Sequence, residues 1–132
     1  DRVVVRGRAG RVAGDGEALR RAVENVVRNA VAFTAPGTQV VVTLDEEGQE
    51  EVVRVRDAGE GLPEEMLEAV FEPFVRAEAA RERYRGGAGL GLAIAARAVR
   101  LHGGSIAAAN VPGGGLEVTV RLPSAGGDRR GS

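Results

Sequence analysis

The chain has 132 residues, the length of one domain, and 43% of them are hydrophobic, as in an ordinary packed protein. Its net charge of −1 gives no broad basic surface, so we expect no nucleic-acid partner. The absence of cysteine excludes disulfides, thiolate chemistry and cysteine-based zinc sites. No apolar run reaches the length of a membrane span.

The first half of the chain predicts a strand followed by a long helix. Residues 2–13 alternate loosely and indicate an edge strand or hairpin, and Asp15 stands where a helix N-cap is expected. Residues 17–33 then have helical period, and Ala35-Pro36-Gly37 ends the helix. The predicted apolar face of this helix consists of Leu19, Val23, Val26, Val27, Ala30 and Phe33.

The remaining elements alternate between strand and helix patterns. They are strands over 39–45 and 51–57 joined by a polar turn, a short helix from Leu62 to about Ala69, a charged loop over 75–88, a helix over 90–101, and strands over 105–110 and 116–122. Paired strands with amphipathic helices between them predict an α+β fold. We expect a two-layer α/β sandwich, with a mixed, mostly antiparallel sheet of about five strands covered on one face by about three helices. Residues 1–123 would form the domain and 124–132 a disordered tail.

Three alternating glycines, Gly87, Gly89 and Gly91, open the helix that begins near residue 90. Missing side chains let a backbone approach an anion, and the free amides at a helix start point toward it. This segment therefore predicts a phosphate-binding loop, although a tight turn before a helix would have the same pattern.

Two asparagines, Asn25 and Asn29, lie one turn apart on the first long helix and project from one face. We expect that face to be opposite Val23, Val27 and Ala30. An amide oxygen suits a magnesium ion that keeps its waters and phosphate ligands. The alternative is a solvated face without function, but asparagine is a poor helix former, so two of them in mid-helix call for a reason.

Two further segments carry candidate binding residues. Asp57 follows a strand directly, and Gly59 and Gly61 come after it, so a carboxylate could accept from an exocyclic amine while a flat ring lies on the backbone. A capped turn at a strand end would have the same sequence. Phe71 and Phe74 are expected to pack in the core, and Arg76 is a candidate phosphate contact.

The four segments, in this order, resemble the boxes of the catalytic and ATP-binding domain of sensor histidine kinases. The matching sequences are ALRRAVENVVRNAVAFT (N box), DAGEGL (first glycine box), FEPFVR (F box) and GGAGLGLAIA (second glycine box). The resemblance covers about residues 3–123 and is greatest to the envelope-stress type of sensor kinase. It implies the Bergerat ATP-binding fold, which the gyrase, heat-shock chaperone and mismatch-repair ATPases share.

The resemblance also implies a role for each matching residue, with ATP and Mg²⁺ as ligands. Asn29 would ligate magnesium, and Asn25 would support the phosphate site. Asp57 would bind the adenine amino group, with Gly59, Gly61 and Phe33 around the ring. The phosphates would be held by Gly87, Gly89, Gly91 and the amide of Leu90 or Leu92. Arg76 would reach the γ-phosphate, and residues 77–88 would form a lid that orders on binding.

One position departs from the family pattern. The N box usually has a basic residue three positions after the second asparagine, where this chain has Ala32. A phosphate-contacting cation is then missing, unless Arg28 or an arginine of the lid (Arg81, Arg83 or Arg85) replaces it. This departure bears on whether the domain has full catalytic activity, and it leaves the nucleotide site itself intact.

The pattern favours phosphoryl transfer over hydrolysis. In the ATPases of the superfamily a glutamate four residues before the metal asparagine activates water, and this chain has Asn25 there. Glu24 is rotated by about 100° around the helix and should point elsewhere. The one histidine, His102, lies within the glycine-box helix, so a structural role is favoured over a catalytic one.

The implied acceptor is therefore a histidine on a separate dimerisation domain of the same parent, with a response regulator downstream. We expect this domain to be cytoplasmic and monomeric when isolated, and its parent to be a homodimer anchored in the inner or cell membrane. Two alternatives remain: an anti-sigma-type protein-serine kinase, and a non-catalytic nucleotide-binding pseudokinase, which Ala32 would favour.

Overall fold

The structure is a computed structural model that describes residues 3–7, 10–72 and 88–125. The elements in chain order are β1 (Val3–Gly7), α1 (Gly16–Phe33), β2 (Val40–Glu47), β3 (Glu50–Arg56), α2 (Met66–Ala69), α4 (Ala88–Leu101), β4 (Ser105–Asn110) and β5 (Leu116–Pro123). Most lie close to their predicted ranges, but β1 ends at Gly7, well before residue 13, and α2 begins at Met66, four residues after Leu62. Residues 75–87 of the predicted loop, with Arg76 and Gly87, lie outside the described residues.

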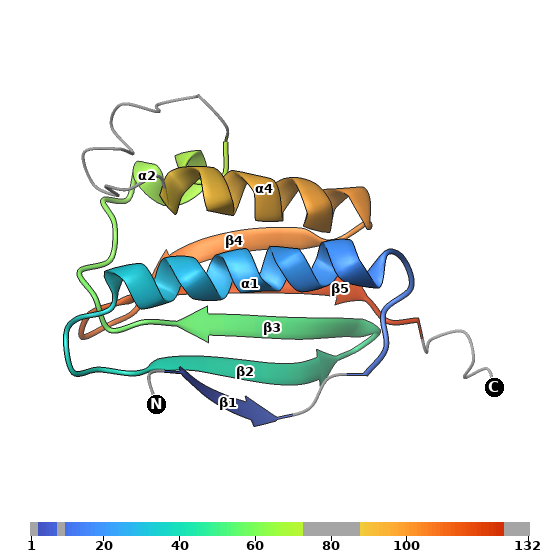
Figure 1. The fold of residues 1–132 in the computed structure, drawn as a ribbon, viewed down its shortest axis with the longest axis horizontal. Coiled ribbons are helices and arrows are strands. Elements are labelled where there is room, and N and C mark those ends of the chain that lie inside the picture. Colours follow the sequence, from blue (N-terminus) through green and yellow to red (C-terminus); the bar gives the residue numbers. More distant parts are fainter. Residues whose placement is uncertain (1–2, 8–9, 73–87, 126–132) are drawn as a thin grey trace.

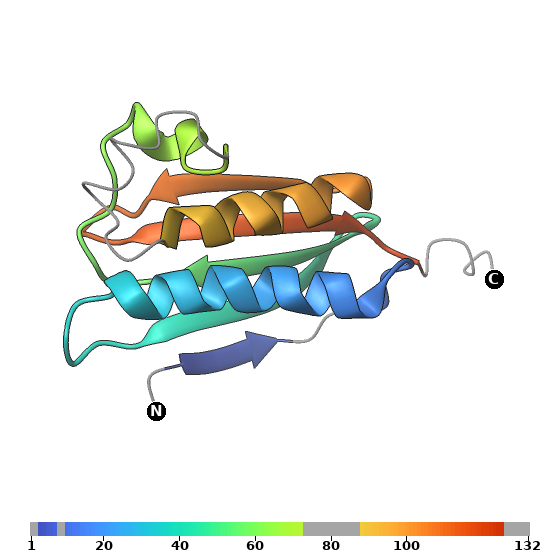
Figure 2. The same ribbon diagram turned by 45° about the horizontal axis from the view of Figure 1, so that its top comes forward.

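The strands form one sheet in the order β1-β2-β3-β5-β4. β1 pairs with β2 in parallel, and all other neighbours are antiparallel. α1 and α4 lie side by side on one face of this sheet, and α2 lies at one end of the helical layer (Figures 1 and 2). The predicted α+β two-layer sandwich with a mixed, mostly antiparallel five-stranded sheet is therefore confirmed.

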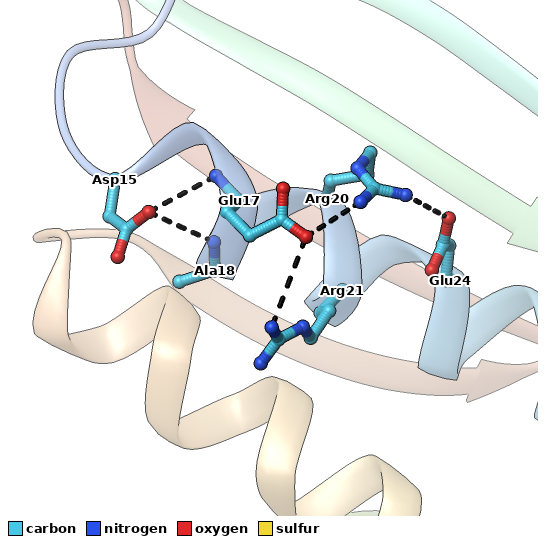
Figure 3. Close-up of polar contacts among 6 residues, drawn as sticks. All are labelled: Asp15, Glu17, Ala18, Arg20, Arg21 and Glu24. Carbon is cyan, nitrogen blue, oxygen red and sulfur yellow. Dashed lines mark hydrogen bonds and ion pairs between the residues drawn. The ribbon is translucent and has the colours of Figure 1, made fainter.

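The start of α1 is fixed by local polar contacts. The Asp15 carboxylate accepts hydrogen bonds from the amides of Glu17 (3.1 Å) and Ala18 (3.2 Å), as an N-cap does (Figure 3). Arg20 then bridges Glu17 (2.6 Å) and Glu24 (2.8 Å) along the exposed side of the helix. The helix therefore begins where the sequence predicts, because Asp15 satisfies amides that the first turn leaves free.

The buried face of α1 differs from the predicted one. Its buried residues are Leu19, Ala22, Val26, Asn29 and Ala30. Val23, Val27 and Phe33 are only half-buried at the edge of the core. The helix packs on the sheet and also against α4, so its buried stripe includes the side that carries Asn29. The expectation that the asparagine face is opposite the packed face is thus wrong for Asn29.

The inner face of the sheet supplies the other half of the core. β5 alternates as predicted, with Leu116, Val118, Val120 and Leu122 buried under the helices. α4 contributes Leu92, Ala95, Ala96 and Val99, each with no exposed surface.

One inner-face position of the sheet is a carboxylate. Glu51 on β3 is only 2% exposed, and it accepts hydrogen bonds from the Gly10 amide (2.5 Å) and the Ser124 hydroxyl (2.5 Å). Ser124 and Ala125 also donate backbone hydrogen bonds to Gln49 (2.9 Å) and Arg11 (2.7 Å). Glu51, Gln49 and Arg11 therefore hold Ser124 and Ala125, the first two residues after β5 and of the predicted tail. Residues 126–132 lie outside the described residues.

Glu46 on β2 shares a hydrogen bond with Glu51. Burial raises the pKa of Glu51, but the hydrogen bonds from Ser124, Gly10 and Glu46 together hold it below its usual value. The hydrogen bond to Glu51 and the charge of Glu51 raise the pKa of Glu46. The proton on Glu46 therefore stabilises the fold below the usual glutamate pKa, and this stability is lost as pH rises through the raised pKa. Glu51 contributes in the opposite sense, because its stabilisation is lost as pH falls through its lowered pKa.

We expect Glu46→Gln to raise the midpoint of thermal unfolding more at about pH 8 than at about pH 5. A glutamine amide donates to Glu51 at every pH, whereas Glu46 does so only while protonated. Thermal unfolding across this pH range checks the difference, with Glu64→Gln on the surface as the matched control. An equal shift at both pH values would show that no proton is shared between Glu46 and Glu51.

Candidate functional site

A cavity of about 200 Å³ lies where the C-terminal end of α1 meets the end of β3. These two ends come together at the left of Figure 1. The described lining residues are Asn29, Ala32, Phe33, Asp57, Glu60, Gly61, Leu62 and Leu116. Four of the predicted site residues, Asn29, Phe33, Asp57 and Gly61, are thus brought together from two separate segments of the chain.

Asp57 is positioned by the strand that precedes it and by β5. Its carboxylate is 6% exposed, and its Oδ1 atom accepts from the amides of Gly59 (2.8 Å) and Leu116 (3.1 Å). The Asp57 amide in turn donates to the Leu116 carbonyl (3.0 Å). Among the described residues no donor reaches the second carboxylate oxygen, Oδ2. A ligand with an N–H group therefore has a fixed acceptor at this wall of the cavity.

The glycines around Asp57 are required by close backbone contacts. A Cβ atom on Gly59 would lie 2.2 Å from the Phe33 carbonyl oxygen, and one on Gly115 would lie 2.1 Å from the Asp57 carbonyl oxygen. Gly61 has a φ of 77°, and a Cβ there would lie 2.5 Å from the side-chain oxygen of Asn110. The loop after β3 can therefore run over the α1 terminus and β4 only with glycine at positions 59 and 61, and the start of β5 can approach Asp57 only with glycine at position 115.

Asn110 holds this loop from β4. Its amide group donates to the Leu62 carbonyl (2.8 Å), and its side-chain oxygen accepts from the Leu62 amide (2.8 Å). On the other side, the Thr34 hydroxyl accepts from the Ala58 amide (2.9 Å). The segment that forms one wall of the cavity is thus pinned at both ends before any ligand arrives.

Asn29 has an unsatisfied polar atom in the buried stripe of α1. The residue is 5% exposed, and its Oδ1 atom is buried without a hydrogen-bond partner among the described residues. Such an oxygen is costly to bury, by about 1–3 kcal/mol, unless a ligand completes it. It fits a hard cation that takes neutral oxygen ligands. The described residues contain no group of three or more His, Cys, Asp and Glu residues that could hold a metal ion.

Asn25 lies one turn before Asn29 and faces α4. A Cβ on Gly91 would be 4.0 Å from the Asn25 side-chain oxygen, and the same oxygen accepts from Nη1 of Arg28 (3.1 Å). The N-box asparagines and the second glycine box are therefore adjacent in space, although they are about 60 residues apart in sequence.

α4 begins at Ala88, so the amides of Ala88, Gly89 and Leu90 have no acceptor within the helix. Gly91 lies against Asn25, at a distance where a Cβ would make only ordinary van der Waals contact. Leu92 is the fifth helical residue, so its amide belongs to the helical ladder, and its side chain is fully buried in the core. Of the two predicted amides, helix geometry therefore favours that of Leu90.

The sequence matches the family described as Histidine kinase-, DNA gyrase B-, and HSP90-like ATPase over residues 14–126. The chain belongs to this family. Curated relatives include the sensor histidine kinases WalK of Bacillus subtilis, 38% identical over 111 residues, and CpxA of Escherichia coli, 40% identical over 110 residues. Each alignment covers 83% of this chain but only 18% of WalK and 24% of CpxA, so the chain spans less than a quarter of these relatives.

Solved structures of the same type have the same fold. The mycobacterial sensor histidine kinase MprB is 31% identical with a TM-score of 0.77, and the match covers 92% of this chain and 80% of that chain. Full-length ShkA in complex with AMPPNP is 30% identical with a TM-score of 0.72, covering 92% of this chain and 24% of that chain. The resemblance inferred from the four boxes is confirmed: the chain is an ATP-binding catalytic domain of the sensor histidine kinase type.

The sequence missed several residues of this ATP-binding domain. Leu62, Leu116 and Glu60 line the cavity, Gly115 allows the approach of β5 to Asp57, and Asn110 fixes the glycine loop. Glu60 and Leu62 have a signal in the sequence because they stand in the first glycine box, and Gly115 is the last of three glycines before a strand. Leu116 and Asn110 reach the site through the pairing of β5 with β3 and β4, which no local pattern contains.

His102 lies at the far end of α4 from the cavity. Its Nε2 atom accepts from the Asp15 amide (3.0 Å), and Nδ1 is hydrogen-bonded to the Ala98 carbonyl oxygen (2.8 Å). A Cβ on Gly14 would lie 2.2 Å from the imidazole ring. Both ring nitrogens therefore join the start of α1 to the end of α4, which is the structural role expected for this residue.

Proposed function

We propose that this domain binds Mg-ATP and transfers the γ-phosphoryl group to a histidine on a separate dimerisation domain of its parent protein. One observation carries the proposal. Asn29, whose buried side-chain oxygen has no partner among the described residues, and Asp57 line one cavity, and the adjacent Asn25 faces the glycine-rich first turns of α4. The base requires the acceptor on Asp57, the cation requires the oxygen of Asn29, and the phosphate chain requires the free amides at the start of α4.

Each group has a defined part in binding. Asp57 would accept from the adenine amino group, and Gly59, Gly61 and Phe33 would surround the ring. Gly87, Gly89, Gly91 and the Leu90 amide would hold phosphate oxygens, and Arg76 would reach the γ-phosphate. Asn29, supported by Asn25, would hold magnesium, which when bound would neutralise charge on the phosphates.

The surroundings of Asn29 favour transfer over hydrolysis. A base that activates water must lie within hydrogen-bond reach of it. Glu24, the α1 carboxylate nearest in sequence, is exposed and paired with Arg20 (2.8 Å) on the outer side of the helix (Figure 3). Asn25, one turn before Asn29, cannot act as a base at neutral pH. The domain would therefore position the γ-phosphoryl group for a nucleophile supplied from outside.

The partners follow from this reaction. The acceptor domain would be part of the same parent, which we infer to be a membrane-anchored homodimer with this domain in the cytoplasm, and a response regulator would take the phosphoryl group next. Within the described part of the chain, no helix is long and apolar enough to cross a bilayer.

Transfer can be measured by mixing this domain, ATP and the separately purified dimerisation domain of the parent protein. We expect phosphohistidine, which is acid-labile and stable to alkali, on the added domain only. The variant Asn29→Ala serves as the negative control. ATP binding without transfer would instead support the pseudokinase alternative, and stoichiometric phosphohistidine on this domain alone would overturn the assignment of the acceptor.

A further inference from the structure

The described wall of the cavity supplies no positive charge for the phosphates of a nucleotide. It carries the carboxylates of Asp57 and Glu60, and no lysine or arginine is among its described lining residues. Ala32, which is exposed at this wall, has no side chain to offer a phosphate. A fixed guanidinium would still strengthen the binding of a polyphosphate that is held by amides and one cation, because charge-assisted hydrogen bonds are stronger than those between neutral groups.

Arg28 lies on the stripe of α1 that faces this region. Asn25, Arg28, Asn29 and Ala32 follow the spacing i, i+3, i+4, i+7, so all four share one face of the helix. The guanidinium of Arg28 donates to the same Asn25 oxygen that approaches Gly91. Arg28 is thereby placed beside the second glycine box, one helical turn before Ala32.

Arg28 also differs from the other arginines of α1. Arg20 and Arg21 form ion pairs with Glu17, and Arg20 with Glu24 as well (Figure 3). Arg28 has no carboxylate partner among the described residues, and its one hydrogen bond is to a neutral amide. Its positive charge is therefore not neutralised within the described part of the domain, whereas that of Arg20 and Arg21 is.

We propose that Arg28 binds the phosphate chain of the nucleotide and supplies the cation that Ala32 does not. This inference rests on the proposed function. A guanidinium fork can clamp two phosphate oxygens, and the long side chain spans the single turn that separates Arg28 from Ala32. The Asn25 oxygen would orient the guanidinium before ATP arrives, so less rotamer freedom is lost on binding.

The test compares ATP with adenosine, which has the base but no phosphates. We expect Arg28→Ala to weaken ATP binding by about 10- to 100-fold and to change adenosine binding by less than about twofold. Arg28→Lys should lose less ATP affinity than Arg28→Ala, because lysine keeps the positive charge although it lacks the guanidinium group that can bind two oxygens. Arg21→Ala, on the same helix but ion-paired, should bind both ligands as the unmodified domain does.

A rescue experiment separates this role from a structural one. Adding Ala32→Arg to Arg28→Ala should restore most of the lost ATP affinity, whereas Ala32→Arg alone should improve it less, because the two arginines would serve one phosphate site. Unchanged ATP binding by Arg28→Ala, or an equal loss for ATP and adenosine, would overturn the proposal for Arg28 while leaving the proposed function standing. No binding of either ligand by the unmodified domain would overturn both.

Discussion

Replacing Asn29 with alanine is expected to remove the magnesium dependence of ATP binding and to weaken binding of Mg-ATP by about 10- to 100-fold. Asn29 lines the cavity, its side-chain oxygen is buried without a partner among the described residues, and a hard cation needs such a ligand. Calorimetric titration of the variant with a non-hydrolysable ATP analogue, with and without magnesium, measures both effects. Adenosine affinity should be unchanged, because Asp57 and the glycine loop are untouched.

The same variant should unfold at a temperature equal to or above that of the unmodified domain. The alanine removes a buried oxygen whose lack of a partner costs about 1–3 kcal/mol, and the space left opens into an existing cavity. A site residue can be destabilising in this way, and its removal then separates binding from folding. If ATP binding by Asn29→Ala kept its full magnesium dependence, or if the variant unfolded at a much lower temperature, Asn29 would be a structural residue of the core and not a cation ligand.

Replacing Asp57 with asparagine is expected to weaken ATP and adenosine to the same extent, by about 10- to 100-fold. The asparagine oxygen can keep the hydrogen bonds from Gly59 and Leu116, so the loop should hold its place. Its NH₂ group would replace the free oxygen, and a donor would then face the amino group of adenine. Competition between ATP, adenosine and GTP measures the loss and the expected fall in preference for adenine.

Asp57→Ala is the companion variant, because it also removes the acceptor of two backbone amides. It should lower the free energy of unfolding by about 1–3 kcal/mol, whereas Asp57→Asn should leave it nearly unchanged. Adenosine binding by Asp57→Asn equal to that of the unmodified domain would place the base elsewhere in the cavity.

The sequence was sufficient to predict features that depend on residues close together along the chain. The alternation of β5 predicted which of its side chains face the core, and Asp15 predicted the start of α1, because each depends on residues close along the chain. Asp57, which lines the cavity, was predicted as a site residue in the same way, since a carboxylate at a strand end followed by spaced glycines is a local pattern.

Features that depend on long-range packing could not be predicted. Asn29 is buried on α1, a helix that packs along α4, and α4 begins about 60 residues later in the chain. The contacts of Asp57 with Leu116 require β3 and β5 to pair, and the buried position of Glu51 requires Gly10 and Ser124 to cover it. In each case a residue that looks polar and exposed in the sequence is buried by a distant segment.

The most direct measurement is calorimetric titration of the unmodified domain with a non-hydrolysable ATP analogue, with and without magnesium. Asp57 and Asn29 each have a side-chain oxygen without a partner among the described residues, and the amide-rich start of α4 lies beside their cavity. This arrangement predicts one nucleotide per chain, bound more tightly when magnesium is present. No binding under either condition would contradict the assignment of this cavity as a nucleotide site. Binding that is indifferent to magnesium would contradict the role of Asn29.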